Sequence, residues 1–196
     1  AVLIAYSRDH FSDMGEWIER LPAIVVSPKN TEEIQRIVQT ANYYKVPVYS
    51  IGIGSSILRG SINEIPGILL DFERMDKIEV DEENMTVTLE PGVSCIICTG
   101  YFKKHLHKLG LRPYFTGGPG PQTMVSAVVV SGINKLRGAK YGQQFHQTVS
   151  VELVLPDGRI LNTGSRADVA LKGFWMHGPG PDLTYLPCRV SSGLGI

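Results

Sequence analysis

The feature that most constrains the fold is a strand, a helix and a second strand within residues 23–51. Ala23 to Val26 is a short β-branched run that ends at a Ser-Pro pair and is typical of a buried strand. Asn30 or Thr31 can cap the helix that follows. Four apolar residues at i, i+3, i+4 and i+7 give this helix one buried face: Ile34, Ile37, Val38 and Ala41. Val46 to Ile51 is the second strand, and this order predicts a right-handed parallel crossover.

A third strand and two hairpins are predicted farther along the chain. Gly67 to Asp71 has the composition of a third strand. Lys77 to Val80 and Thr86 to Glu90 flank a polar turn and predict a β-hairpin. Val149 to Leu155 and Arg159 to Asn162 flank a Pro-Asp-Gly turn and predict another.

Helical patterns occur between the two hairpins. Cys95 to Leu109 is predicted as a helix, and Gly110 is a suitable stop. Gln122 to Val130 fits either a helix or a buried strand, because its valine run suits both. We therefore predict an α+β fold with two lobes. Residues 1–76 form a small parallel α/β lobe, and residues 77–196 form a larger, mainly antiparallel α+β lobe.

The overall composition gives no sign of several classes of protein. Lys plus Arg and Asp plus Glu both number 19, so no basic excess indicates nucleic acid or an anionic membrane as a partner. The apolar runs are far shorter than the ~20 residues of a membrane span, and no signal peptide is expected. Three cysteines do not make a disulfide framework, and a cytoplasmic location is the simplest expectation.

The loop that leaves the second strand carries the first chemical signal, Gly52-Ile53-Gly54-Ser55-Ser56. Glycine lets a backbone turn sharply and approach a ligand closely, and successive N–H groups in such a turn attract an anion. The serine hydroxyls add donors, so the loop is suited to cradling a pyrophosphate. An ordinary tight turn is the alternative. The loop has neither the spaced glycines of a dinucleotide fingerprint nor the lysine of a phosphate loop.

Three further features each admit a chemical and a structural interpretation. The loop Gly117 to Thr123 can lie against a flat ligand or be a surface connection. Cys95 and Cys98 can form a redox or metal pair, but their apolar surroundings favour core packing. The turn Asp81 to Asn84 is expected to be solvated. The scattered histidines are expected to be mostly surface or structural: His10, His105, His107, His146 and His177.

Taken in order, these segments resemble the FAD-binding domain of the vanillyl-alcohol oxidase / p-cresol methylhydroxylase superfamily, the PCMH type. Leu21 to Ile34 is similar to the opening of that domain, and Val46 to Ser56 to its pyrophosphate loop. Further motifs follow in the family's order: Ile68 to Ile78, Val87 to Val93, Tyr141-Gly142, Val151 to Gly158, Gly178 to Leu186 and Gly193 to Ile196. This co-linear match over nearly the whole chain is more specific than any single motif.

The resemblance implies that FAD binds between two lobes. It assigns the pyrophosphate to the first loop: Ile51, Gly52, Ile53, Gly54, Ser55 and Ser56. It places a second group at or near the flavin: Pro121, Gln122, Thr123, Ser126, Gly132, Tyr141 and Gly142. Val151 and Ile196 are implied to lie near the adenine.

The chain departs from the family pattern in three ways. Thr123 is followed by Met124, where the family often carries glycine. Ser55 stands where some members attach FAD covalently through a histidine, so no such attachment is expected at this loop. The family's full-length enzymes continue into a substrate-binding domain. We therefore expect that domain, or a second subunit, to lie outside this chain.

The implied function is that of an FAD-dependent oxidase or dehydrogenase, in which the flavin accepts a hydride from a small molecule. The run from Gly178 favours an aromatic alcohol or para-alkylphenol as substrate, whereas Asp182 to Leu186 favours a 2-hydroxy acid. No catalytic residue and no metal site is assigned within this chain. A non-catalytic flavin-binding subunit and an unrelated α+β binding protein are the alternatives.

Overall fold

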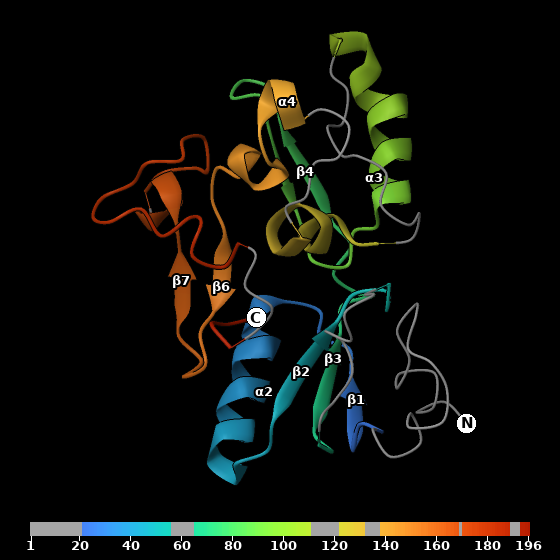
Figure 1. Cartoon of the computed structure of the whole chain (residues 1–196), viewed down its shortest axis with the longest axis vertical. Helices are drawn as coiled ribbons and strands as arrows, with labels where there is room; N and C mark the ends of the chain where they lie inside the picture. Colours follow the sequence, from blue (N-terminus) through green and yellow to red (C-terminus); the bar gives the residue numbers. More distant parts are fainter. Residues whose placement is uncertain (1–20, 56–64, 111–121, 132–137, 169, 189–192) are drawn as a thin grey trace.

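The structure consists of two lobes arranged along the long axis of the molecule (Figure 1). It is a computed structural model, and it describes residues 21–55, 65–110, 122–131, 138–168, 170–188 and 193–196. One lobe contains a parallel sheet, and antiparallel hairpins and helices make up the remainder. The predicted α+β class is therefore confirmed.

The first lobe is built on a parallel sheet with the strand order β1-β3-β2. β1 (Ile24–Val26) and β2 (Val48–Ile51) both pair in parallel with β3 (Ile68–Asp71). The parallel arrangement predicted from the strand-helix-strand order is confirmed, with a third strand inserted between the other two. Leu69 and Leu70 of β3 are completely buried because this strand has a neighbour on each side.

The position of β1 differs from the prediction. The β-branched run indicated a buried strand, but Ile24 is 52% exposed, because among the described strands β1 pairs with β3 alone and lies at the edge of the sheet. β-branched residues suit edge and central strands alike, so composition alone did not give the position of this strand.

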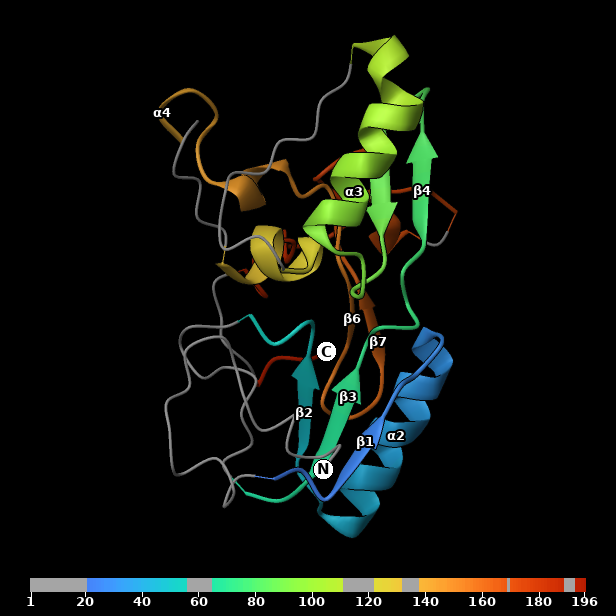
Figure 2. The same cartoon turned by 90° about the vertical axis from the view of Figure 1, so that its right-hand side faces the viewer.

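Helix α2 (Thr31–Tyr44) covers one face of the parallel sheet (Figure 2). Its N-cap is Asn30, whose side chain accepts a hydrogen bond of 2.9 Å from the backbone N–H of Glu33. The helix ends at Lys45, which adopts the left-handed conformation. The apolar face predicted from the spacing is confirmed, since Ile34 and Val38 pack with Leu70, Phe72 and Met75 in a first hydrophobic core.

The second lobe begins with the predicted hairpin of β4 (Ile78–Asp81) and β5 (Thr86–Leu89), which pair antiparallel. The predicted helix follows as α3 (Cys95–Tyr101), a π-helical stretch η2 (Phe102–Leu106) and a 3-10 turn η3 (His107–Leu109). Gly110 ends it in the left-handed conformation, as its position in the sequence predicted.

The ambiguous segment after Gln122 contains both a strand bridge and a helix. Thr123 forms an isolated antiparallel bridge with Ser94. The chain then becomes helical and continues as η4 (Ser126–Ser131). Met124 and Ala127 pack with Val93 and the α3 cysteines in a second hydrophobic core.

The remaining elements are short. They are α4 (Gly138–Tyr141), η5 (Gln144–Gln147), η6 (Gly164–Ala167), and the strands β6 (Glu152–Val154) and β7 (Ile160–Asn162). β6 and β7 form the second predicted hairpin, in antiparallel register.

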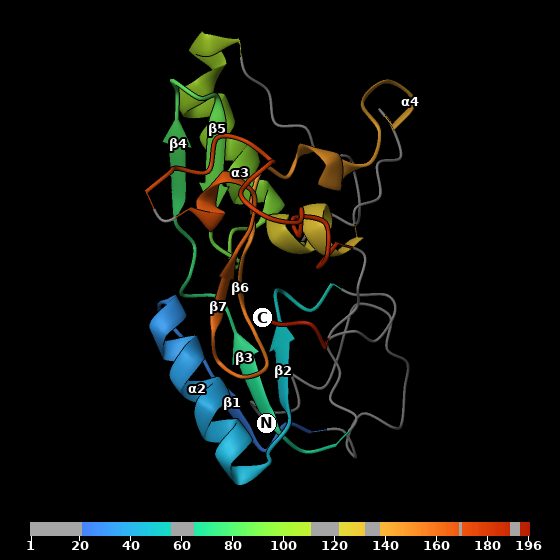
Figure 3. The ribbon, with the colours of Figure 1, turned by 90° about the vertical axis from the view of Figure 1, so that its left-hand side faces the viewer.

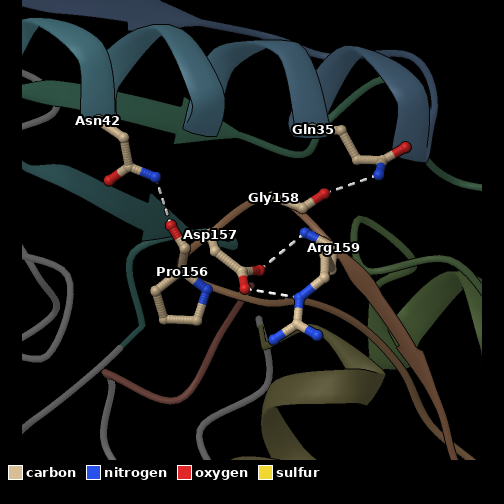
Figure 4. A network of polar contacts seen from close by, with 6 residues as sticks. All are labelled: Gln35, Asn42, Pro156, Asp157, Gly158 and Arg159. Carbon is tan, nitrogen blue, oxygen red and sulfur yellow. Dashed lines mark hydrogen bonds and ion pairs between the residues drawn. The ribbon is translucent and has the colours of Figure 1, made fainter.

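The turn of the β6-β7 hairpin is held against α2 (Figure 4). Gln35 Nε2 donates to the carbonyl of Gly158 at 2.7 Å, and Asn42 Nδ2 donates to that of Pro156 at 2.5 Å. Gly158 has a φ of 83°, and a Cβ there would lie 2.7 Å from Cγ of Gln39. Glycine therefore gives the turn its left-handed conformation and lets it approach the helix.

The end of the chain also belongs to the first core. Ile196 exchanges two backbone hydrogen bonds with Val154, of 2.9 and 2.7 Å, and both residues pack in that core. The C-terminal residues lie between the two lobes in Figure 1 and Figure 3. The boundary at residue 76 stays a prediction, and β6 and Ile196 return to the core of the lobe that precedes it.

Replacing Gly92 with alanine is expected to lower the free energy of unfolding by about 2 to 3 kcal/mol. A Cβ at this position would lie 2.0 Å from the carbonyl oxygen of Phe72 and 2.7 Å from that of Met75, so the backbone would have to shift. Chemical denaturation followed by circular dichroism measures the change.

Gly100→Ala is the matched control, because no atom lies within 4 Å of a Cβ there and the residue is in α3. Alanine favours a helix over glycine by up to about 1 kcal/mol, so this variant should be as stable as the parent or more so. Equal midpoints for the two variants would contradict the close approach at Gly92.

Candidate functional site

The loop after β2 turns sharply at its glycines. Ile51 is 6% exposed and anchors the end of the strand, whereas Ile53 is 45% exposed. Gly54 has a φ of 66°, a conformation that favours glycine, and Gly52 and Ser55 are half-buried. Ser56 lies outside the described residues. The chain is therefore in a tight, partly accessible turn at the place predicted for pyrophosphate.

Gly52 lies directly against Thr123, a residue of the segment expected near the flavin. A Cβ at Gly52 would lie 2.8 Å from Cγ2 and 3.0 Å from Oγ1 of Thr123, closer than real Cβ contacts allow. The two residues are 71 positions apart in the sequence, and the family resemblance implied a contact with FAD for both. The fold thus brings the two candidate loops together, and it does so only because residue 52 has no side chain.

Thr123 is held rigidly in this contact. It is 3% exposed, its carbonyl accepts from the N–H of Ala127 at 2.9 Å, and its hydroxyl lies 3.4 Å from the N–H of Ser126. Cys95 N donates to the carbonyl of Gln122, and Met124 N to that of Val93, at 2.9 and 2.8 Å. These bonds fix the point at which the chain leaves the strand bridge and enters a helix. Gln122, Thr123 and Ser126 all lie at this point.

Residues 93–95, which hold Thr123, were not among the residues expected to contact FAD. Ser94 also caps α3, because its hydroxyl accepts from the N–H of Ile97 at 3.1 Å. The motif Val87 to Val93 resembles the family. Only the strand bridge between Ser94 and Thr123 shows that the residue after this motif holds the Thr123 segment in place. No local sequence signal pairs these two segments.

Met124, which replaces a glycine common in the family, points into the protein. It is 7% exposed and packs with Val93, Cys98 and Ala127 in the second core. The Met124 side chain is therefore part of the second hydrophobic core. Its neighbours Gln122 and Ser126 are half-buried.

The other predicted residues lie in separate segments. Tyr141 ends α4, and Gly142 follows with a φ of 75°; a Cβ there would lie 2.7 Å from Nδ1 of His146. Half-buried Val151 exchanges hydrogen bonds with Thr163, whose hydroxyl accepts from Val151 N at 2.8 Å. Ile196 pairs with the same strand, β6, through Val154. Pro121 and Gly132 lie outside the described residues.

Three buried polar atoms have no hydrogen-bond partner within the described part of the chain. They are Gln143 Oε1, Thr148 Oγ1 and Asn162 Oδ1. An unsatisfied buried polar group destabilises a protein by about 1 to 3 kcal/mol, so such atoms call for a ligand or water. They lie in the same part of the sequence as Gly142 and Val151, and a polar nucleotide would fit them.

The cysteines are buried thiols. Cys95, Cys98 and Cys188 are free and at most 9% exposed. Burial raises the pKa of Cys95, and it raises the pKa of Cys98 and of Cys188 to about 11. Within the described residues, no group of three His, Cys, Asp or Glu side chains is arranged to hold a metal ion. The core-packing interpretation of Cys95 and Cys98 is confirmed.

The remaining candidates are on the surface. The four described histidines are exposed: His105, His107, His146 and His177. In the acidic turn, Asp81 accepts hydrogen bonds from the side chain and the backbone of Asn84, which lower the pKa of its carboxyl group. Glu82, Glu83 and Asn84 of the turn are exposed, and Asp81 is half-buried, in keeping with the predicted solvated turn.

Three features are typical of a two-lobed nucleotide-binding domain: a parallel sheet, a glycine turn at the end of one of its strands, and a helix-starting threonine packed on that turn. The FAD binding domain family matches residues 22–164 of the chain. The protein belongs to this family, so the resemblance found in the sequence is confirmed. FAD is accordingly its cofactor.

Relatives with named activities match over most of this chain. It is 31% identical over 183 residues to "Glycolate oxidase subunit GlcD" of Bacillus subtilis, covering 91% of this chain and 36% of that protein. It is 32% identical over 145 residues to "D-lactate dehydrogenase" of Archaeoglobus fulgidus, covering 73% and 31%. The chain thus spans about a third of the length of these relatives.

Solved structures share the fold. 4-Ethylphenol oxidase from Gulosibacter chungangensis superposes with a TM-score of 0.75 at 22% identity, over 100% of this chain and 37% of that one. p-Cresol methylhydroxylase superposes with a TM-score of 0.73 at 20% identity, over 100% and 37%. At these identities the likeness concerns the fold alone. Among the described residues, no helix has the length and apolar character needed to cross a membrane.

Gly52→Ala is expected to lower the free energy of unfolding by about 1 to 3 kcal/mol, because the new methyl group would overlap Thr123. Thr123→Ser removes the nearest atom, Cγ2, and keeps the hydroxyl. In a double-mutant cycle measured by chemical denaturation, serine should recover a large part of the loss. Additive effects of the two substitutions would contradict the contact.

The buried thiols predict a loss of stability at high pH. The folded-state pKa of Cys98 and of Cys188, about 11, lies above the ordinary value of 9.0, so the folded protein holds these protons more tightly. Their contribution is complete below pH 9 and is lost as the pH rises through 11. The free energy of unfolding should fall less over this range in the variant Cys98→Ala/Cys188→Ala than in the parent. Equal slopes would contradict the assignment.

Proposed function

We propose that this chain is the FAD-binding part of an enzyme that oxidises a 2-hydroxy acid. The observation that carries the proposal is the contact of Gly52 with Thr123, which joins the two loops assigned to the cofactor. Named relatives support the substrate class, because the glycolate oxidase subunit and the D-lactate dehydrogenases match most of this chain at up to 32% identity.

The backbone turn Ile51 to Ser55 would hold the pyrophosphate of FAD, together with Ser56, the next residue in the sequence. A turn without side chains at Gly52 and Gly54 lets amide groups approach the phosphate oxygens closely. Thr123, packed on Gly52, would fix the distance between this turn and the flavin side, where Gln122 and Ser126 are half-buried.

The adenine would lie along β6. Val151 and Ile196 both border this strand, and the unsatisfied atoms of Thr148 and Asn162 lie close to it in sequence. A nucleotide with several donors and acceptors satisfies such atoms, and this is the observation that fits FAD to these residues.

The flavin supplies hydride acceptance when bound. The described residues of this chain bind and orient the cofactor, and no general base is assigned to them. The substrate domain or a second subunit would supply the groups that bind the substrate and take its proton. We also propose the division at residue 76 into two lobes and a cytoplasmic location.

A 2-hydroxy acid is preferred to an aromatic alcohol because of the relatives. The run Asp182 to Leu186 favours the hydroxy acid, whereas the Gly-Pro-Gly-Pro run before it favours the aromatic alcohol. The structures that oxidise phenols share only the fold at 20 to 22% identity, so the relatives detected by sequence carry more weight.

Cofactor binding is tested by titrating the apoprotein with FAD and measuring the visible absorption and the fluorescence of the flavin. The parent should bind FAD, and Gly52→Ala should weaken binding about tenfold or more, because the methyl group displaces Thr123 from the turn. Gly100→Ala, in an open position of α3, should bind as the parent does. A colourless parent protein that stays colourless after addition of FAD would contradict the proposal.

The substrate class is tested on the longest natural form of the protein. D-Lactate and glycolate are compared with vanillyl alcohol and p-cresol under anaerobic conditions, and bleaching of the flavin is recorded. Bleaching by the hydroxy acids is the expected result. Bleaching by the phenols alone would assign the aromatic branch, and FAD binding without bleaching by any donor would favour a non-catalytic flavin subunit.

A further inference from the structure

The charges of this chain are segregated, although they sum to zero. The 61 residues between Glu90 and Glu152 contain seven Lys or Arg and no Asp or Glu. The other 135 residues contain 12 Lys or Arg and all 19 Asp or Glu. A net charge of zero therefore hides a strongly basic stretch in the second lobe, and such a stretch attracts anions.

Three of these lysines lie together on an outward helix surface. Lys103, Lys104 and Lys108 are exposed in the continuation of α3, with the exposed His105 and His107 between them. The opposite side of the helix is buried through Cys98 and Leu106. Among the described residues, no ion pair joins these lysines to a carboxylate.

Two large apolar side chains precede the lysines on the same outward surface. Ile96 is 64% exposed and Ile97 is 53% exposed. Ile97, Lys104 and Lys108 are all exposed along this run of helix, whereas Cys98 and Leu106 are buried. Exposed isoleucines beside lysines on one helix face are typical of a helix that lies on a lipid surface.

The position of the lysines favours a lipid surface over an acidic electron-transfer protein. α3 begins at Ser94 and Cys95, which hold the Thr123 segment, and the lysines are at its other end. The helical run of residues 95–109 extends about 20 Å along its axis. A protein docked on the lysines would therefore be far from the segment assigned to the flavin, whereas attachment to a membrane needs no such proximity.

We propose that the outward face of α3 and its continuation, formed by Ile96, Ile97, Lys103, Lys104 and Lys108, attaches the protein to the surface of an anionic phospholipid bilayer. The lysines contact lipid phosphates, and the isoleucines enter the interface between headgroups and acyl chains. This attachment does not depend on the proposed oxidation, because no residue assigned to FAD takes part in it.

The test is co-sedimentation of the FAD-loaded protein with vesicles of phosphatidylcholine, with and without phosphatidylglycerol. The parent should bind the vesicles that contain phosphatidylglycerol, and added salt should weaken binding. The variant Lys103→Gln/Lys104→Gln/Lys108→Gln should lose binding on the order of a hundredfold. Ile96→Ala/Ile97→Ala should lose about tenfold with less dependence on salt.

The matched control is Lys29→Gln/Lys45→Gln/Lys172→Gln, which removes the same charge from exposed positions elsewhere. It should bind as the parent does, and circular dichroism verifies that all variants are folded. Equal binding to both kinds of vesicle, or equal loss in the two lysine variants, would overturn the proposal. So would a parent that ignores vesicles but is retained on immobilised polyglutamate, because an acidic protein would then be the partner.

Discussion

The close approach of Gly52 to Thr123 is the contact on which the candidate site depends. The turn after β2 belongs to the parallel-sheet lobe, and Thr123 is held by the second lobe through the strand bridge to Ser94. A methyl group at position 52 would overlap the threonine side chain. The missing side chain therefore lets a backbone turn and a rigid helix start lie against each other, as two surfaces that share one ligand must.

The two lobes are joined by segments that are distant in the sequence. Val154 and Ile196 complete the core begun by Ile34 and Leu70, and Gln35 and Asn42 hold the β6-β7 turn on α2. Through these contacts, residues from the second half of the chain pack against the first lobe. The segments implied to contact adenine are thus fixed by the same packing that stabilises the parallel sheet.

Much of the fold followed from local patterns. The capped helix at Thr31–Tyr44, both hairpins and the stop at Gly110 were predicted because spacing, caps and turn residues act over a few positions. The edge position of β1 was not predicted, because a strand's neighbours are chosen by long-range packing. The helix-or-strand choice after Gln122 stayed open for the same reason, since the bridge to Ser94 spans 29 positions.

The sequence by itself determined the family, the cofactor and the residues able to form a turn around a phosphate, because glycines, caps and ordered motifs are local properties. Only the tertiary structure decided that Gly52 touches Thr123, that Met124 packs in the second core, and that Ile96 and Ile97 are exposed on the helix that continues into the lysines. The physical reason is that contacts between distant segments depend on packing of the whole chain, which no local pattern encodes.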